Sequence, residues 1–177
     1  QFNNVAIVIA LSSLVLVALY PLMKRITYWP QAWLGLTFNW GALVGWAAVA
    51  GSLDAPVYYL YAAGFFWTLG YDTIDAHQDK EDEVLVGVRS PALVFGPRTQ
   101  YWLAGFYFAA LVLFTGAGLR AELNSLYYVG LGLAALHFTW QAWRLDIDDV
   151  QDCWAKFDSN KWLGLLITIS IVLGQSG

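Results

Sequence analysis

Residues 1–23 read QFNNVAIVIALSSLVLVALYPLM and contain no Asp, Glu, Lys or Arg. Five later stretches also lack all four charged residue types: 26–53, 55–71, 99–119, 123–143 and 162–177. Each is close to the ~20 residues with which a helix crosses the hydrocarbon core of a bilayer. The runs are apolar on all faces and do not alternate as barrel strands do, which favours helices. The sequence therefore predicts an all-α, polytopic membrane protein in which residues 1–177 form a single integral-membrane domain with six transmembrane helices.

The overall composition agrees with a protein that lies in a lipid bilayer. Hydrophobic residues make up 59% of the chain and charged residues 12%, whereas soluble proteins carry roughly 25% charged residues. The formal net charge is -4 and no basic stripe is present, which excludes nucleic acid as a partner. A single cysteine, Cys153, excludes a disulfide within the chain and a cysteine-based metal site. The composition indicates no particular protein partner.

The basic residues indicate the orientation of the helices in the membrane. Alternation of six helices places the connections at about 24–30, 72–98 and 144–161 on one side, and those at 51–55 and 120–122 on the other. The first side holds eight of the nine basic residues: Lys24, Arg25, Lys80, Arg89, Arg98, Arg144, Lys156 and Lys161. Because short cytoplasmic loops are rich in Lys and Arg, this side is predicted to be cytoplasmic, or the matrix side in an organelle.

An acidic segment follows the third apolar stretch. Residues 70–83 read GYDTIDAHQDKEDE. On a continuous helix, at ~100° per residue, five carboxylates would fall within an arc of about 100°: Asp72, Asp75, Asp79, Asp82 and Glu83. Like charges at this spacing destabilise a helix by about 0.2–0.5 kcal/mol per pair. The segment therefore predicts a divalent cation held by carboxylate oxygens, and the alternative is a solvated acidic turn.

Basic residues on the same side suit an anionic group such as a diphosphate. Tyr20 and Lys24 are four residues apart and share a helix face, with Arg25 next to them and Pro21 expected to kink the helix. Arg89 could reach the same anion. The alternative is that the two residues at the first helix end snorkel to the interface as membrane anchors and that Arg89 is solvated.

Several remaining polar residues are given structural interpretations. We expect His77 to lie on the polar surface and His137 to be a hydrogen-bonded interior residue. Ser90 and Pro91 are typical of an N-cap and a first helical position. Residues 157–160, Phe-Asp-Ser-Asn, are typical of a helix start before the last span, and the acids at 146–149 are expected to be solvated.

Several elements of the chain resemble the UbiA prenyltransferase superfamily, and within it the 4-hydroxybenzoate polyprenyltransferases of ubiquinone biosynthesis. The acidic segment with the following turn is similar to the second Asp-rich motif of the family, and the end of the first helix is similar to its Tyr-Pro-x-x-Lys-Arg element. Residues 29–35, 144–149 and 159–160 agree as well. The quoted elements are Tyr71-Asp72-Thr73-Ile74, Ala76-His77-Gln78-Asp79, Asp82, Gly87-Val88-Arg89-Ser90, Ala92 and Tyr20-Pro21-Leu22-Met23-Lys24-Arg25.

This resemblance implies a reaction and roles for the site residues. The reaction is Mg²⁺-dependent transfer of a polyprenyl group from its diphosphate to the ring carbon ortho to the hydroxyl of 4-hydroxybenzoate. The implied catalytic and metal-binding residues are Asp72, Asp79, Asp82 and Glu83, with Asp75 as an additional metal candidate. The implied diphosphate-binding residues are Tyr20, Lys24, Arg25 and Arg89. Asp75 and Glu83 depart from the family, which usually has Tyr and Asp at these positions, and Pro91 replaces a Ser or Thr.

The resemblance also implies that part of the family's architecture lies outside these residues. Family members have nine helices and a first Asp-rich motif between the second and third, whereas no segment here resembles that motif. We therefore expect the chain to lack the amino-terminal third of the enzyme and to be inactive alone. The implied location is the bacterial inner membrane or the mitochondrial inner membrane, with the active face toward the cytoplasm or matrix.

Other functions are compatible with the sequence. A prenyltransferase of the same type could use another acceptor, such as haem, homogentisate or a naphthoate. A transporter or channel could use the acidic segment as a cation site, although transporter sites tend to lie near the bilayer midplane. A non-catalytic membrane scaffold is a third alternative, which the departures at Asp75 and Glu83 keep open.

Overall fold

The computed structural model describes residues 3–27, 29–78, 80 and 91–175, with the backbone alone at Lys24, Arg25, Pro91 and Leu93. The described part is all-helical, and no strand occurs in it. This confirms the prediction of an all-α fold. The elements in chain order are α1 (Asn4–Ile26), α2 (Pro30–Phe38), α3 (Trp40–Ala50), α4 (Ala55–Asp75), α6 (Pro91–Phe95), the 3-10 helix η1 (Gly96–Arg98), α7 (Thr99–Arg120), α8 (Ser125–Arg144) and α9 (Val150–Gly174).

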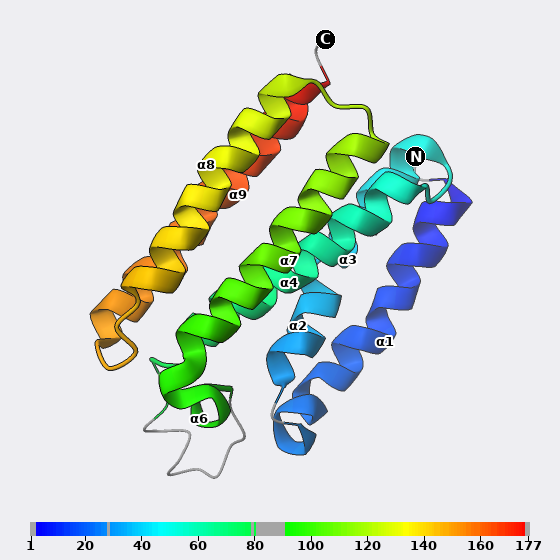
Figure 1. Ribbon diagram of the computed structural model, residues 1–177. Coiled ribbons are helices and arrows are strands. Elements are labelled where there is room, and N and C mark those ends of the chain that lie inside the picture. Colours follow the sequence, from blue (N-terminus) through cyan, green and yellow to red (C-terminus); the bar gives the residue numbers. More distant parts are fainter. Residues whose placement is uncertain (1–2, 28, 79, 81–90, 176–177) are drawn as a thin grey trace.

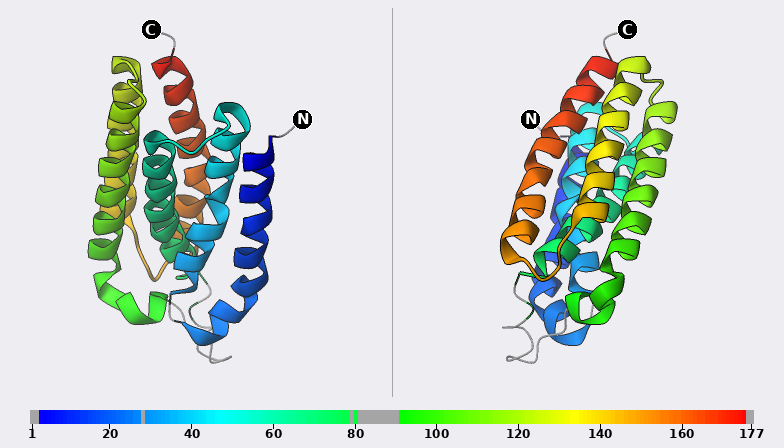
Figure 2. Two further views of the ribbon diagram at one scale, coloured as in Figure 1. Left: turned by 90° about the vertical axis from the view of Figure 1, so that its right-hand side faces the viewer. Right: turned by 60° about the vertical axis from the view of Figure 1, so that its left-hand side comes forward.

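The long helices form a bundle with α4 and α7 at its centre (Figures 1 and 2). α4 packs most extensively on α7, and it also contacts α2, α3 and α9. α8 packs on α7 and α9 at one flank, whereas α1 packs on α2 and α3 at the other. The position of α4 therefore determines how the two flanks are joined.

Helices occupy all six of the charge-free stretches, but the second stretch contains two of them. α2 ends and α3 begins at Asn39, whose side chain donates to the Gly35 carbonyl oxygen at 2.8 Å and to Thr68 Oγ1 at 2.9 Å. The first of these bonds satisfies a carbonyl group near the break, and the second ties the break to α4. A polar residue within the apolar stretch thus interrupts the helix without leaving its amide unpaired.

Three segments of the described chain are long and apolar enough to cross a membrane by length and composition: Asn4–Met23, Pro30–Ala50 and Gly96–Arg120. Six were predicted, and α4, α8 and α9 are the helices that are not among the three. These helices carry polar side chains that face other helices, such as Thr68 on α4, Gln141 on α8 and Asn160 on α9. Such residues lower the mean hydropathy of a helix even when their polar groups are paired inside the bundle.

The last helix begins earlier than predicted. α9 starts at Val150, and the Asp149 carboxylate caps it by accepting from the backbone N–H groups of Gln151 and Asp152. Residues 157–160 therefore lie in the interior of α9, and the helix start predicted there is wrong. Asp158 and Ser159 serve other partners: Asp158 pairs with Lys161 on the helix surface, and Ser159 faces α8.

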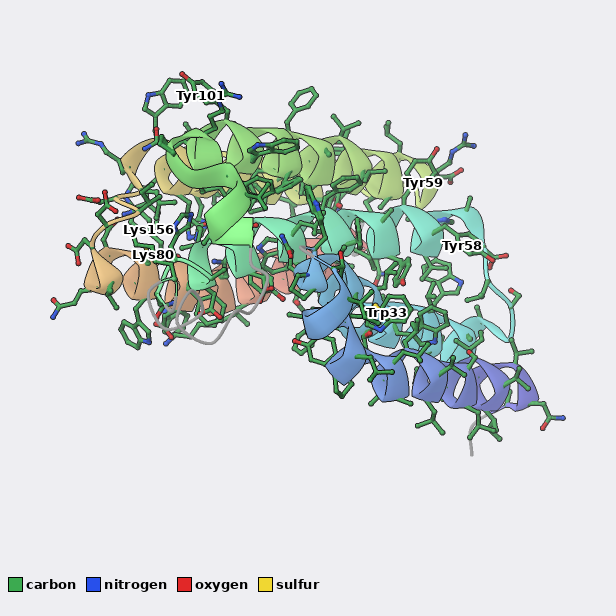
Figure 3. All side chains as sticks on the ribbon, turned by 90° about the horizontal axis from the view of Figure 1, so that it is seen from below. Trp33, Tyr58, Tyr59, Lys80, Tyr101 and Lys156 are labelled. Carbon is green, nitrogen blue, oxygen red and sulfur yellow. The ribbon has the colours of Figure 1, made fainter. Side chains whose placement is uncertain are left out.

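The chain connections gather at two ends of the bundle, as the alternation of helices predicts. The end of α1, the end of α4, α6 and the connection between α8 and α9 lie at one end, shown at the bottom of Figure 1. The connections between α3 and α4 and between α7 and α8 lie at the other. In Figure 3, Lys80 and Lys156 accordingly lie together at one end, and Tyr58 and Tyr59 lie towards the opposite end.

Several polar side chains between α7, α8 and α9 are paired with one another. Tyr107 stacks on Phe138 with a ring-centroid distance of 4.2 Å, and its hydroxyl donates to Gln141 Oε1 at 2.6 Å. The Gln141 amide donates to the Lys156 carbonyl oxygen at 2.7 Å. His137 bonds Ser159 at 2.9 Å, which confirms the prediction of a hydrogen-bonded interior histidine. These bonds connect α7, α8 and α9.

We predict that Gly118→Ala destabilises the bundle. Tyr127 is 1% exposed, donates to the Phe114 carbonyl oxygen at 2.7 Å, and lies so close to Gly118 that an added Cβ would overlap its ring. Overpacking of this kind typically lowers the free energy of unfolding by about 1–3 kcal/mol. The measurement is thermal unfolding of the purified protein in detergent, followed by tryptophan fluorescence.

Gly45→Ala is the matched control. A Cβ at Gly45 in α3 would meet no atom within 4 Å. Replacing an unhindered helical Gly by Ala is expected to raise stability by up to about 1 kcal/mol. Equal unfolding temperatures for the two variants would contradict the assigned α7–α8 contact.

Candidate functional site

The last turn of α4 carries the first two acids of the predicted site. Asp72 and Asp75 are three residues apart and half-buried, and α4 ends at Asp75. The backbone then forms a turn: the N–H of His77 donates to the Ile74 carbonyl oxygen at 3.1 Å and that of Gln78 to Asp75 at 2.9 Å. The Gln78 amide also donates to Asp75 Oδ1 at 2.8 Å. The five-acid arc assumed one continuous helix through residues 72–83. That assumption is wrong, because α4 ends at Asp75 within the segment.

The turn places His77 inside the protein. Its side chain is 2% exposed, and Nε2 lies 2.9 Å from Thr99 Oγ1 at the start of α7. Thr99 donates its own hydroxyl hydrogen to the Gly96 carbonyl oxygen at 2.8 Å, so we infer that His77 Nε2–H is the donor to Thr99. The prediction that His77 lies on the surface is wrong, because the turn after α4 directs it against α7.

His77 is held neutral in this position. Burial, and secondarily the Lys80 ammonium, lower its pKa from 6.5 to about 4, while Asp148 acts in the opposite direction. Nδ1 is buried and has no hydrogen-bond partner in the part of the chain that the structure describes. A neutral, buried imidazole ring is better suited to holding α4 against α7 than to exchanging protons at the protein surface.

Lys80 ties the acidic segment to the connection between α8 and α9. Its ammonium donates to the Ile147 carbonyl oxygen at 2.9 Å and pairs with Asp148 Oδ1 at 2.5 Å. The hydrogen bond from Lys80 lowers the pKa of the Asp148 carboxyl group. Gln100 at the start of α7 donates to the Leu145 carbonyl oxygen at 3.0 Å. The end of α4, the start of α7 and this connection are thus bonded together, and we call these contacts of Lys80 and Gln100 the rim clasp.

The acids at 146–149 are exposed, as predicted, but the sequence did not reveal their partners. Asp148 pairs with Lys80, Asp149 caps α9, and the Asp152 carboxylate accepts from the backbone N–H of Asp146. Their spacing has no pattern that identifies a partner 68 residues away, such as Lys80.

An aromatic and amide group lines the interior beside the end of α4. Tyr71 and Trp67 are in edge contact at 6.0 Å, and Tyr71 also contacts Phe157 of α9 at 5.8 Å. The Trp67 indole donates to Asn160 Oδ1 at 2.8 Å. None of these four residues is among the site residues predicted from the sequence. Tyr71 and Asn160 belong to the elements that resemble the UbiA family, but their contacts with Phe157 and Trp67 have no signal in the sequence.

The predicted diphosphate-binding residues are placed in part. Tyr20 is half-buried on α1, and the helix continues through Pro21 to Ile26, so Lys24 follows Tyr20 by one turn. The side chains of Lys24 and Arg25 lie outside the described part. Asp79, Asp82, Glu83, Arg89 and Ser90 also lie outside the described residues. α6 begins at Pro91, which agrees with its prediction as the first helical residue.

The described residues hold only a part of the predicted metal site. Within them, no group of three or more His, Cys, Asp or Glu side chains is arranged to hold a metal ion. Asp72 and Asp75 supply two carboxylates at the end of α4. Carboxylate oxygen is the donor that Mg²⁺ prefers, so the chemistry of these two residues fits the ion.

The chain is similar to known proteins in both sequence and fold. The model of the UbiA prenyltransferase family matches residues 1–167. The chain belongs to the UbiA prenyltransferase family. The fold agrees with the apo structure of a UbiA homolog from Aeropyrum pernix K1, with a TM-score of 0.78 at 22% identity, covering 97% of this chain and 65% of that one.

Curated relatives of this family member are similar over nearly all of its residues. It is 52% identical over 174 residues to the mitochondrial 4-hydroxybenzoate polyprenyltransferase of Homo sapiens, covering 98% of the chain and 47% of that protein. It is 53% identical over 177 residues to the protein of the same name from Arabidopsis thaliana, covering 99% and 44% respectively. The resemblance noted in the sequence is confirmed. The chain spans about half the length of these relatives.

We predict that Thr99→Val weakens the junction between α4 and α7. Valine keeps the shape of threonine but removes the oxygen that faces His77 Nε2 and leaves a buried ring nitrogen unpaired. The loss of such a partner typically lowers the free energy of unfolding by about 1–3 kcal/mol. Thermal unfolding in detergent measures the change.

Thr115→Val provides the comparison on the same helix. Thr115 is exposed, and its hydroxyl donates only to the Leu111 carbonyl oxygen of its own helix, at 2.8 Å. We expect this variant to unfold within about 0.5 kcal/mol of the wild type. A Thr99 variant as stable as the Thr115 variant would show that the histidine bond does not hold the junction.

Proposed function

We propose that the chain is part of a 4-hydroxybenzoate polyprenyltransferase. The enzyme would transfer a polyprenyl group from its diphosphate to the ring carbon ortho to the hydroxyl of 4-hydroxybenzoate, in ubiquinone biosynthesis. The family membership supports the prenyl transfer, and the identity of about half of all residues to two enzymes of that name supports the acceptor. A prenyltransferase that uses haem, homogentisate or a naphthoate is the nearest alternative.

The observation that carries the proposal is the location of the acids. Asp72 and Asp75 lie in the last turn of α4. The last turn of α1, which contains Lys24 and Arg25, lies at the same end of the bundle. A polyprenyl diphosphate has an anionic head and a long apolar tail, so its binding site needs charged groups directly beside an apolar interior. This end of the bundle provides both.

We assign Mg²⁺ to the acidic segment, with Asp72, Asp79, Asp82 and Glu83 as ligands and Asp75 as a further one. When bound, the ion would neutralise the diphosphate and make it a better leaving group. Tyr20, Lys24, Arg25 and Arg89 would bind the diphosphate oxygens, because their phenol, ammonium and guanidinium groups donate to anions. The proton of the reacting ring carbon would leave after the new carbon–carbon bond forms.

The interior beside Asp72 suits the prenyl tail. Trp67, Tyr71 and Phe157 are in edge contact there, and their rings make this part of the interior apolar. An apolar, water-poor interior would protect an allylic cation from reaction with water. The chain's own contribution is thus to bind the head group at the rim and to exclude water from the tail side.

We further propose that all six helical segments cross the membrane, as α1, α2 with α3, α4, α7, α8 and α9. Three of them satisfy the criteria of length and composition, and the others are of similar length and pack beside them. The end with the acids would face the cytoplasm or matrix. The mitochondrial relatives favour the mitochondrial inner membrane over a bacterial inner membrane.

We predict that Asp72→Asn lowers prenyl transfer at least about 100-fold, since several kcal/mol of charge stabilisation depend on the metal ligands. The protein is expressed from its complete coding sequence, and transfer of a radiolabelled prenyl group to 4-hydroxybenzoate is measured in proteoliposomes with Mg²⁺. Chelation of Mg²⁺ is expected to abolish the wild-type activity.

Asp54→Asn is the control at the opposite end of the bundle. The new amide retains an oxygen that can accept from Trp46 Nε1 and Ser52 Oγ, as Asp54 Oδ2 does. It should keep wild-type activity. Wild-type activity of Asp72→Asn would refute the metal role, and cation flux into vesicles without prenyl transfer would instead support a transporter.

A further inference from the structure

Gln31 in the first turn of α2 is a buried amide that has no hydrogen-bond partner among the described residues. Its side chain is 1% exposed, and neither Oε1 nor Nε2 is bonded. Leaving a buried polar group unpaired typically costs about 1–3 kcal/mol. The remaining buried amides behave differently: those of Gln141 and Asn160 are bonded to neighbouring helices or to their own helix. Gln31 is therefore a candidate for contact with a ligand.

The packing of α2 on α4 places Gln31 beside the acidic end of α4. Gly35, one turn further along α2, lies against Phe65: an added Cβ would be 3.0 Å from its ring and 3.2 Å from its carbonyl oxygen. Tyr61 donates to the Leu36 carbonyl oxygen at 2.9 Å. The two helices run in opposite directions (Figure 1). One turn back on α2 thus corresponds to one turn forward on α4, so Gln31 lies at the level of Leu69, which precedes Asp72 by about one turn.

Aromatic side chains surround this level. Trp29 is in edge contact with Phe95 at 5.1 Å and with Phe106 at 6.3 Å, and Leu69 belongs to the same cluster. Phe65 and Ala32 pack against this cluster too. The walls near Gln31 are therefore flat, apolar surfaces, which suit an aromatic ring.

The amide itself indicates which group it binds. Oε1 can only accept and Nε2 can only donate, and both are unpaired. A diphosphate only accepts, so it would leave Oε1 unsatisfied. A phenol hydroxyl both donates and accepts, and therefore matches the two atoms.

We propose that Gln31 binds the hydroxyl of the aromatic acceptor. Oε1 accepts the phenol hydrogen and Nε2 donates to the phenol oxygen, so the hydroxyl is held near Asp72 with the ring between the aromatic walls. The carbon ortho to the hydroxyl is thereby kept close to the carboxylate end of α4, where the head group of the prenyl donor is proposed to bind. This inference rests on the proposed function and adds an acceptor-binding residue to it.

The test uses Gln31→Met, which preserves the length and approximate volume of the side chain but cannot form these bonds. With the protein from its complete coding sequence in proteoliposomes, we expect KM for 4-hydroxybenzoate to rise about tenfold or more. KM for the polyprenyl diphosphate should stay within about twofold. Inhibition by benzoate, which lacks the hydroxyl, should be the same in the variant and the wild type. Gln151→Met, at an exposed position in the first turn of α9, is the matched control and should change neither KM.

The outcomes separate this inference from the proposed reaction. An unchanged KM for 4-hydroxybenzoate would overturn the role of Gln31. An equal rise of KM for both substrates would also overturn it and would indicate a structural role. Equilibrium binding of labelled 4-hydroxybenzoate is measured in parallel. If the wild type binds 4-hydroxybenzoate but transfers no prenyl group, and Gln31→Met weakens this binding, the proposed reaction is rejected and the phenol site is retained. The absence of binding to the wild type would reject both.

Discussion

The close contact of α4 with α7 is the interaction on which the rest of the bundle depends. Gly70 of α4 lies directly against the Tyr107 ring, where any Cβ would overlap it. Tyr107 in turn stacks on Phe138 and donates to Gln141, and Gln141 donates to the Lys156 carbonyl oxygen of α9. One missing side chain on α4 thus makes room for a tyrosine that joins α7 to α8 and, through a single amide, to α9. The acids at the end of α4 are positioned by this packing.

The bundle has more long helices than hydropathy identifies as membrane spans. Hydrogen bonds between helices explain this difference. α1 carries few polar groups and packs on α2 and α3, and much of its apolar surface is exposed. α8 and α9 instead face each other through Gln141, Ser159 and His137. Where every polar group has a partner on the next helix, a lower mean hydropathy is compatible with burial in lipid. Composition alone cannot distinguish such a helix from a surface helix.

The sequence predicted the helical class, the grouping of the connections and the family, because these depend on long runs and local motifs. It failed where a single side-chain contact decides the structure. Asp149 starts α9 earlier than the Ser and Asn at 159–160 suggested, since a cap needs only one side chain and its local backbone. His77 is internal because Thr99 offers an acceptor 22 residues away. Gln31 was visible only as part of a family element, and its burial depends on how α2 packs on α4.

The rim clasp has a consequence for the electrostatics of the acidic segment. Between residues 72 and 83 the chain has six acids, at 72, 75, 79, 81, 82 and 83, and a single base, Lys80. Lys80 is engaged by Asp148 and the Ile147 carbonyl oxygen, outside that segment. The base within the segment therefore pairs with an acid outside it, and the sequence of the segment carries a net negative charge. A net negative charge of this kind raises the local concentration of cations in solution.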